Sequence, residues 1–205
     1  MRLDVCSTLP TRLLTGTWFR ATTNQYLSKL LQTSYSRGKA SRFYHGQIKT
    51  KLPEYETLYL AQNQFVALKE VEALLGSQEG GLIANPEQAW HLQPIEVQLQ
   101  RVVDLTEQSV QEQLETSVQE ITGDWKAYSP RLAPTQNLGL ALFQRTPRIE
   151  GFLVASARVP TSSNLIVFPS RLLRKSLVWY RFTDLDAKQH ERSIGGKKRT
   201  SKPGI

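Results

Sequence analysis

Thr57-Leu-Tyr-Leu-Ala-Gln-Asn-Gln-Phe-Val-Ala-Leu-Lys-Glu-Val-Glu-Ala-Leu-Leu-Gly76 is the stretch that decides the expected fold. Its apolar first part, 58–61, predicts a short buried strand. After a two-residue turn, apolar residues recur at steps of three and four, which predicts a helix over 64–75 with one apolar face: Phe65, Leu68, Val71 and Leu75. Gly76 favours the end of that helix, because glycine readily adopts positive φ. The stretch therefore predicts a strand that leads directly into a helix.

Two polar side chains stand out in this stretch, one on each predicted element. Tyr59 lies on the expected strand, and Glu70 lies on the expected helix, beside its apolar stripe rather than at its centre. Glu70 can therefore point along the seam between strand and helix, toward whatever Tyr59 contacts. A carboxylate at the edge of a core is either a solvated helix residue or a catalytic one. The stretch alone leaves both interpretations open.

Composition and cysteine content exclude several classes of protein. The chain has 205 residues, 40% hydrophobic and 21% charged, which is typical of one or two globular domains. No apolar run reaches the roughly 18 residues that span a bilayer, and the N-terminus shows no signal peptide. Cys6 is the only cysteine, so no intrachain disulfide can form. Because the only three histidines are scattered, we expect no metal site, and we expect no membrane association and a cytoplasmic location.

The basic charge is concentrated at the C-terminus. The formal net charge is +8, and six of the 26 Lys and Arg residues lie from Lys188 onward, against the single acidic residue Glu191. Residues 188–205 are rich in Gly, Ser and Lys, which predicts a disordered, solubilising tail after a domain of residues 1–187. The alternative is a basic, non-catalytic module that binds nucleic acid through this tail. It ranks lower, because no aromatic residues lie among the charges as single-strand binding would favour.

The rest of the chain predicts a mixture of strands and helices. Strands are expected at 16–21, 151–156 and 164–168, with one or two more within each of 91–105 and 172–183. Helices are expected at 24–33, in two short segments within 106–122, and at 134–146, where Gly139 weakens the pattern. The elements do not alternate strictly as βαβ units. This order argues for an α+β fold rather than a doubly wound sheet.

Polar residues lie next to the expected apolar strands in a recognisable order. The order is Trp18-Phe19-Arg20, then Ser41-Arg42-Phe43, then Tyr59 with Glu70, and finally Phe152 to Ala157, which includes Ser156, followed by Asn164 to Phe168. This pattern resembles the RES-domain family, which is named for an arginine, a glutamate and a serine. The resemblance covers roughly residues 14–175.

The resemblance implies both a fold and an activity. The expected fold is like that of ADP-ribosyltransferase toxins, an α+β fold with a central antiparallel or mixed β core and flanking helices. The expected activity is degradation of NAD by hydrolysis or phosphorolysis, and some relatives instead transfer ADP-ribose to a protein. Many members are toxins paired with an Xre-type antitoxin that occludes the active site. The domain is then 1–187, with its core at about 14–175.

Two positions depart from the family pattern. The family often has Gly-Gly before the second arginine, where this chain has Ala40-Ser41, and it often has proline before the serine, where this chain has Ala155. The first change bears on how closely the loop can approach a phosphate. Neither change removes a reactive group.

The chemistry of NAD cleavage suits the residues that carry the resemblance. Arginines can bind a diphosphate bidentately, which suits Arg20 and Arg42. Breaking the nicotinamide–ribose bond builds positive charge on the ribose, which a fixed carboxylate such as Glu70 stabilises. Tyr59 could stack on nicotinamide or orient the ribose. Ser156 is expected to donate a hydrogen bond to NAD or to Glu70 rather than to act as a nucleophile, because no histidine is placed to activate it.

These considerations define the expected site and partners. Glu70, Arg20 and Ser156 are the expected catalytic residues, and Arg20, Arg42, Tyr59 and Asn164 are expected to bind NAD, with Asn164 in a supporting contact. NAD is expected as the substrate, with no further cofactor. The expected protein partner is an Xre-type antitoxin, with a homo-oligomer as a further option and with nucleic acid reached only through the antitoxin. A protein ADP-ribosyltransferase on the same fold is the alternative activity.

Overall fold

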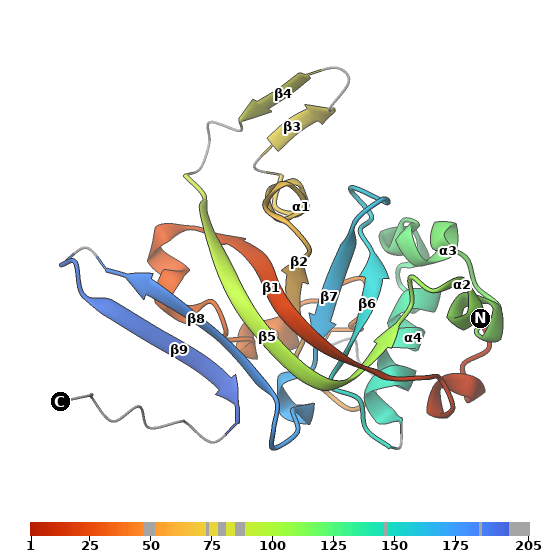
Figure 1. Cartoon of the computed structure of the whole chain (residues 1–205). Helices are drawn as coiled ribbons and strands as arrows, with labels where there is room; N and C mark the ends of the chain where they lie inside the picture. Colours follow the sequence, from red (N-terminus) through yellow and green to blue (C-terminus); the bar gives the residue numbers. More distant parts are fainter. Residues whose placement is uncertain are drawn as a thin grey trace.

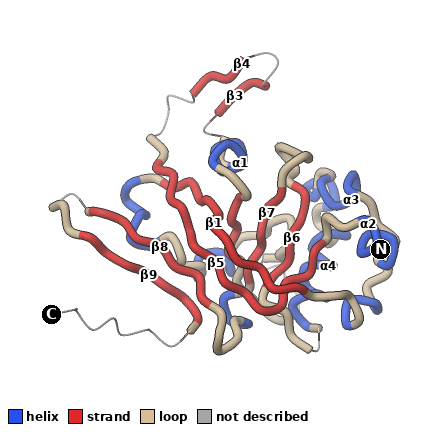
Figure 2. Tube along the Cα trace, viewed as in Figure 1, coloured by secondary structure: helices blue, strands red, loops and turns tan. Residues whose placement is uncertain are grey.

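The fold is a mixed α+β arrangement built on one large β-sheet (Figure 1; Figure 2). The computed structural model describes residues 1–46, 52–72, 74–77, 81–84, 89–145, 147–184 and 186–196. In this part of the chain, no helix is long and apolar enough to cross a membrane. The expected α+β class with a β-sheet core is confirmed.

Seven strands form the large sheet, in the order β1-β2-β7-β6-β5-β8-β9. They are β1 (Arg12–Thr22), β2 (Leu58–Ala61), β5 (His91–Asp104), β6 (Gly151–Ala155), β7 (Ser163–Val167), β8 (Leu177–Thr183) and β9 (Gln189–Gly195). β1 also pairs along most of its length with β5, so the pairings run from β1 through β2, β7, β6 and β5 back to β1. The β5–β6 pair is parallel, whereas the other pairs of this sheet are antiparallel. A separate hairpin, β3 (Leu74–Ser77) with β4 (Gly81–Ala84), extends beyond α1 (Figure 1).

Helices cover two different parts of the sheet. α2 (Gln108–Gln113), α3 (Val118–Thr122) and α4 (Pro134–Gln144) gather beside β6 near the N-terminus, whereas α1 (Gln64–Glu70) lies alone beyond the end of β2 (Figure 1). Short 3₁₀ helices occupy Asp4–Ser7, Asn24–Lys29, Ser34–Gly38, Trp125–Tyr128 and Pro169–Arg171. Asn63 starts α1, because its side chain accepts the N–H of Val66 at 2.9 Å.

The sheet separates the hydrophobic core into clusters. Side chains that alternate along β2 belong to different clusters. Leu58 and Leu60 are buried in a cluster that includes Trp18, Leu99 and Tyr180. Successive side chains of a strand point to opposite faces, and Tyr59 accordingly packs against a second cluster around Phe43, Leu138 and Phe152, while Ala61 joins a small third cluster under α1. The face on which Tyr59 lies is the one where the site forms.

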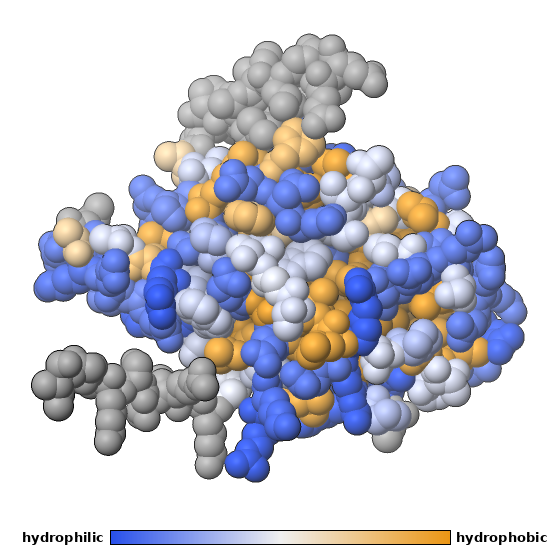
Figure 3. Space-filling model, in the orientation of Figure 1, coloured by the Kyte–Doolittle hydropathy of each residue, from blue (hydrophilic) through white to orange (hydrophobic). Residues whose placement is uncertain are grey.

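On the side of the molecule seen in Figure 3, hydrophilic residues predominate at the edges and hydrophobic residues gather near the centre.

α4 approaches the turn that carries Arg42 very closely. A Cβ at Gly139 would lie 2.1 Å from the carbonyl oxygen of Phe43, so this position of the helix admits no side chain. Gln136, one turn earlier, donates hydrogen bonds to the carbonyls of Ser41 at 3.1 Å and Tyr44 at 3.3 Å. The turn from Ser41 to Tyr44 is therefore held in place by α4.

Most of the expected elements are confirmed. Strands form at 58–61, 151–155 and 163–167, and β1 and β5 are single long strands that include 16–21 and 91–104. Two short helices lie within 106–122, and α4 lies within 134–146. The helix expected at 24–33 is only a 3₁₀ helix over Asn24–Lys29.

Three expectations were wrong in part. The helix expected over 64–75 ends at Glu70, and Leu74–Ser77 is strand β3. α1 buries Val66 and Ala67 against the sheet, while Phe65 and Leu68 are only partly buried, so the expected apolar stripe is not the buried face. Part of the tail expected to be disordered, Gln189–Gly195, is β9, which pairs along its whole length with β8. Main-chain pairing needs few apolar anchors, and this strand adds the stacking of His190 on Phe182. Residues 197–205 lie outside the described residues.

Candidate active site

Glu70, at the C-terminal end of α1, is held by two side chains, one directly after β6 and one on β7. Its Oε1 accepts hydrogen bonds from Ser156 Oγ at 2.6 Å and from Asn164 Nδ2 at 2.6 Å. Glu70 itself is solvent-exposed, whereas Ser156 is fully buried and Asn164 is 9% exposed. A carboxylate on a short helix is thus oriented by two groups that the sheet fixes in place.

The surroundings of Ser156 define its role. Its Oγ accepts the backbone N–H groups of Arg158 at 3.2 Å and Val159 at 3.1 Å, and its hydroxyl proton is donated to Glu70. Because these two N–H groups occupy the acceptor side of Oγ, the hydroxyl is directed at the carboxylate. The geometry is that of a hydrogen-bond donor to Glu70 rather than of a nucleophile.

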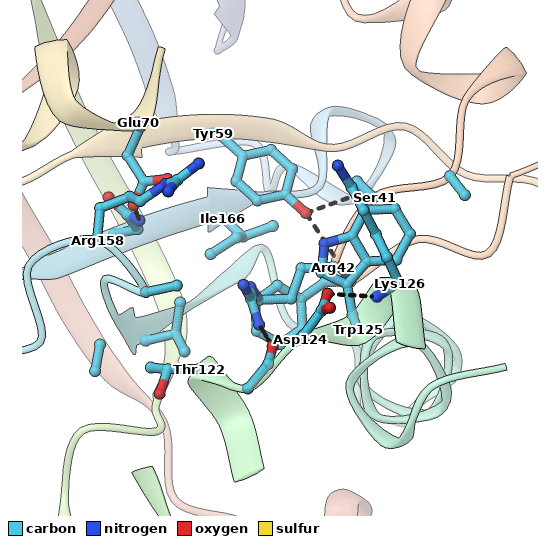
Figure 4. Close-up of a pocket in the computed structure, with 17 residues that line it drawn as sticks. Ser41, Arg42, Tyr59, Glu70, Thr122, Asp124, Trp125, Lys126, Arg158 and Ile166 are labelled. Carbon is cyan, nitrogen blue, oxygen red and sulfur yellow. Dashed lines mark hydrogen bonds between the residues drawn. The ribbon is translucent and has the colours of Figure 1, made fainter. Parts of the chain in front are cut away.

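Tyr59 projects from β2 and joins the Glu70 region to the turn from Ser41 to Tyr44. Its hydroxyl shares a hydrogen bond of 2.9 Å with Ser41 Oγ and accepts the backbone N–H of Phe43 at 3.3 Å (Figure 4). Burial raises the pKa of Tyr59 above its ordinary value, so the phenol is neutral at physiological pH. The ring offers a neutral face and edge to whatever occupies the site.

Two backbone carbonyls orient the side chain of Arg42. Its Nη1 donates to the backbone carbonyls of Ile121, at 3.3 Å, and Gly123, at the C-terminal end of α3. Burial lowers the pKa of Arg42, and the negative charge of Glu70 opposes this effect. An arginine pKa stays far above neutrality, so Arg42 is a cation on the wall of the cavity described next.

These residues line two cavities that share one wall. The larger cavity has a volume of about 480 Å³ and is lined by Arg42, Arg158, the segment Asp124-Trp125-Lys126 and the shared wall. The smaller, of about 340 Å³, lies toward Phe19, Arg20 and Ala61. The shared wall consists of Ser41, Tyr59, Glu70 and Asn164. In Figure 4, Glu70 and Arg158 lie beside each other on one side of the larger cavity, and Trp125 and Lys126 lie across from them.

Arg20 lines the smaller cavity and not the larger one. Its Nη2 donates to the hydroxyl of Tyr35, and its Nη1 is buried without a hydrogen-bond partner among the described residues. Arg20, Arg42, Tyr59 and Asn164 thus line the two cavities that Glu70 borders, and Ser156, which lines neither cavity, contacts Glu70 directly. The structure separates the two predicted phosphate-binding arginines, Arg20 and Arg42, into neighbouring cavities.

Several lining residues were not predicted from the sequence. Ser41 was not expected as a site residue, and its hydroxyl forms a hydrogen bond with that of Tyr59. Arg158 follows Ser156 by two positions, and its charge beside a predicted site serine was the signal that could have revealed it. Trp125 and Lys126 belong to a short 3₁₀ helix that no local pattern places near β2. Over the described ranges, no group of three or more His, Cys, Asp or Glu side chains could hold a metal ion.

Comparison with known proteins decides the family. The sequence profile of the RES domain matches residues 17–183, most of the chain. This chain belongs to the RES domain family. The resemblance carried by Arg20, Arg42, Glu70 and Ser156 is thereby confirmed.

The fold of this RES domain is also similar to that of a solved structure. The similar chain comes from the crystal structure of the M. tuberculosis MbcT–MbcA toxin–antitoxin complex, with a TM-score of 0.59 and 19% sequence identity. The match covers 94% of this chain and 90% of that one. At this identity the likeness concerns the fold. No curated protein matches the chain.

Proposed function

We infer that this RES domain consumes NAD by cleaving its nicotinamide–ribose bond, on a fold like that of ADP-ribosyltransferases. The observation that carries the proposal is the carboxylate of Glu70, which Ser156 and Asn164 fix on the wall between two cavities. The cationic residues Arg42, Lys126 and Arg158 line the larger cavity, where a diphosphate can be bound.

The geometry suits a reaction that builds positive charge on a ribose. As the C1′–N bond breaks, its electron pair leaves with nicotinamide, and the ribose acquires oxocarbenium character. Glu70 stabilises that charge, because its position is set before the reaction and needs no reorganisation. Ser156 and Asn164 hold the carboxylate, and the neutral Tyr59 borders both cavities beside it.

The acceptor completes the reaction at C1′. With water, a new C1′–O bond forms, the surplus proton goes to solvent, and the products are nicotinamide and ADP-ribose. With inorganic phosphate, a phosphate oxygen forms the bond, and the product is ADP-ribose 1″-phosphate. Both acceptors are compatible with a cavity that carries cationic side chains and is open to solvent.

The proposed biological role is that of a toxin in a toxin–antitoxin pair in the cytoplasm, where NAD is available. Family membership and the similarity in fold to MbcT, which was crystallised with its antitoxin MbcA, support this role. The expected partner is a small helical protein of Xre type, encoded beside this chain. Expression of the chain alone should arrest growth, and co-expression of that neighbour should restore it. Growth unaffected by the chain alone would contradict the toxin role.

Protein ADP-ribosylation is the second candidate. It is favoured by the exposure of Glu70, because a side chain of another protein could then reach C1′ as the acceptor. The same residues would serve both reactions.

The test is incubation of the purified protein with NAD labelled in the adenosine part, in buffer, with phosphate, and with cell extract. Free ADP-ribose or its phosphate would support NAD degradation, and labelled protein would support transfer. NAD that stays intact under all three conditions would contradict both.

A further inference from the structure

Arg158 lies in the larger cavity on the segment that follows Ser156, close to Glu70 (Figure 4). Its guanidinium forms an ion pair with Glu72, a residue in the left-handed region (φ 58°) just beyond the end of α1. The pair thus joins the connection between β6 and β7 to the end of α1. Both side chains are well exposed, at 54% for Arg158 and 63% for Glu72.

The larger cavity contains Arg42 and Arg158, whereas Arg20 lines only the neighbouring one. Burial is the largest cause of the lowered pKa of Arg42, and the charge of Arg158 is the smallest of the causes, lowering it further. An anion placed between two guanidinium groups relieves their repulsion and accepts hydrogen bonds from both. A diphosphate has enough oxygen atoms to serve both arginines.

We propose that Arg158 is the second anion-binding arginine of the larger cavity and that a phosphate group of a dinucleotide replaces the carboxylate of Glu72 as its partner. The identification of the anion as the diphosphate of NAD rests on the proposed function. The cavity itself requires only a compact ligand that carries a phosphate group.

The strengths of the two interactions favour this exchange. An ion pair between two exposed side chains contributes little, because water solvates both charges well. A phosphate can accept two parallel hydrogen bonds from a guanidinium. A diphosphate also carries more negative charge than a carboxylate. Glu72 therefore keeps Arg158 at the cavity only weakly. A phosphate group of a substrate can replace Glu72 as the partner of Arg158.

Arg158 can be tested without disturbing Ser156. The contacts of this segment to Ser156 Oγ come from the backbone N–H groups of residues 158 and 159, which remain when the side chain is removed. Arg158→Ala thus removes the guanidinium and leaves the support of Glu70 in place. Glu72→Gln removes the competing negative charge at constant size.

The two substitutions should change KM for NAD in opposite directions. Arg158→Ala should raise KM by about 10- to 100-fold, the range for loss of a charge-assisted hydrogen bond, with a small change in kcat. Glu72→Gln should lower KM by about two- to fivefold, because the exposed ion pair no longer competes. The matched control is the exposed pair Arg181–Glu191 on β8 and β9, where Arg181→Ala and Glu191→Gln should leave KM unchanged.

A purely structural role for the ion pair gives a different result. If Arg158 and Glu72 only join two segments, the two variants should both raise KM or both leave it unchanged, and either result overturns the proposal.

Direct binding separates a failure of this proposal from a failure of the proposed function. Pyrophosphate and ADP-ribose are titrated calorimetrically into wild-type, Arg158→Ala and Glu72→Gln proteins. If wild-type protein leaves NAD intact but binds these probes more tightly than Arg158→Ala and more weakly than Glu72→Gln, the anion site stands and NAD cleavage fails. Equal affinities in the three proteins, or no binding to any of them, overturn the anion site whether or not NAD is cleaved.

Discussion

Glu70 and Glu150 are both carboxylates fixed by hydrogen bonds, but they are fixed in different ways. Glu150 precedes β6 and is fully buried, and both of its oxygens accept backbone N–H groups: Oε2 from Gln100 at 2.6 Å and Arg101 at 2.9 Å, and Oε1 from Leu173 at 2.8 Å. Glu70 is held by side chains at Oε1 only, and no donor of the described residues reaches its Oε2. A carboxylate whose two oxygens are satisfied by the backbone joins segments, whereas one with a free oxygen on a cavity wall can act on a ligand.

The largest effect on activity is expected for Glu70→Gln. This change removes the charge while keeping the size, so turnover of NAD should fall about 10²- to 10³-fold, or roughly 3–4 kcal/mol, with little change in binding. Glutamine is nearly as good a helix former, so the melting temperature should not change. The measurement is NAD depletion at saturating NAD, and equal rates would remove Glu70 from the mechanism.

Glu150→Ala should have the largest effect on stability. It leaves the N–H groups of Gln100, Arg101 and Leu173 without their acceptor, and each buried unpaired donor costs about 1–3 kcal/mol. We expect the free energy of unfolding to fall by about 3 kcal/mol or more. Denaturant unfolding would measure this, with Glu70→Ala as the comparison that should lose less, because Glu70 is exposed and its removal leaves two donors rather than three without an acceptor. Similar losses in the two variants would break the contrast between the two carboxylates.

Ser156→Ala tests whether the support of Glu70 matters for catalysis. It removes one donor to the carboxylate, so kcat should fall about 10- to 100-fold, as for loss of a hydrogen bond to a charged group. Ser176→Ala is the matched control, because Ser176 is equally buried and its Oγ has no partner within the described ranges. A normal kcat in Ser156→Ala would show that Asn164 alone suffices to hold Glu70.

Tyr59→Phe should give the smallest change, a loss of about 1 kcal/mol in the free energy of unfolding at neutral pH, because the hydroxyl contacts to Ser41 and Phe43 are lost. Burial raises the pKa of Tyr59 above 10.0, so the folded protein keeps a proton that the unfolded chain loses. This contribution is complete below pH 10 and is lost as the pH rises toward the raised pKa. The difference between wild type and variant should therefore shrink in unfolding experiments above pH 10. The exposed Tyr128 gives the control at neutral pH, where Tyr128→Phe should leave the free energy of unfolding unchanged.

The sequence predicted those parts of the site that depend on local pattern. The strands that carry Tyr59 and Asn164 are short apolar runs, and the helix that carries Glu70 follows from periodicity, so these elements were recognisable. The end of α1 was not recognisable from the sequence. The apolar periodicity continues to Leu75, whereas the chain changes direction at Glu72, with φ 58°. β9 was missed because main-chain pairing with β8 leaves little trace in composition.

The separation of Arg20 from Arg42 could not be predicted, because it depends on contacts between distant parts of the chain. Arg42 is directed by carbonyls about 80 positions later, at Ile121 and Gly123, and Arg20 is directed by Tyr35. The order of motifs in the sequence predicts which residues belong to the site. It does not predict on which side of Glu70 each residue lies. Arg158 differs, because its charge two positions after Ser156 was a local signal that the sequence did contain.

Gly139 has a consequence for any attempt to stabilise this protein. In most helices, glycine replaced by alanine gains about 1 kcal/mol of helix propensity, and a survey of α4 by propensity alone would select this position first. Here the methyl group would press against the main chain of Phe43, one residue from Arg42. Either α4 or the turn would have to move, and the turn bears Ser41 and Arg42 on the cavity wall. The glycine that weakens the helix by propensity is thus the condition for close packing of this turn, and Gly139→Ala would lose stability and displace Arg42 from the cavity wall.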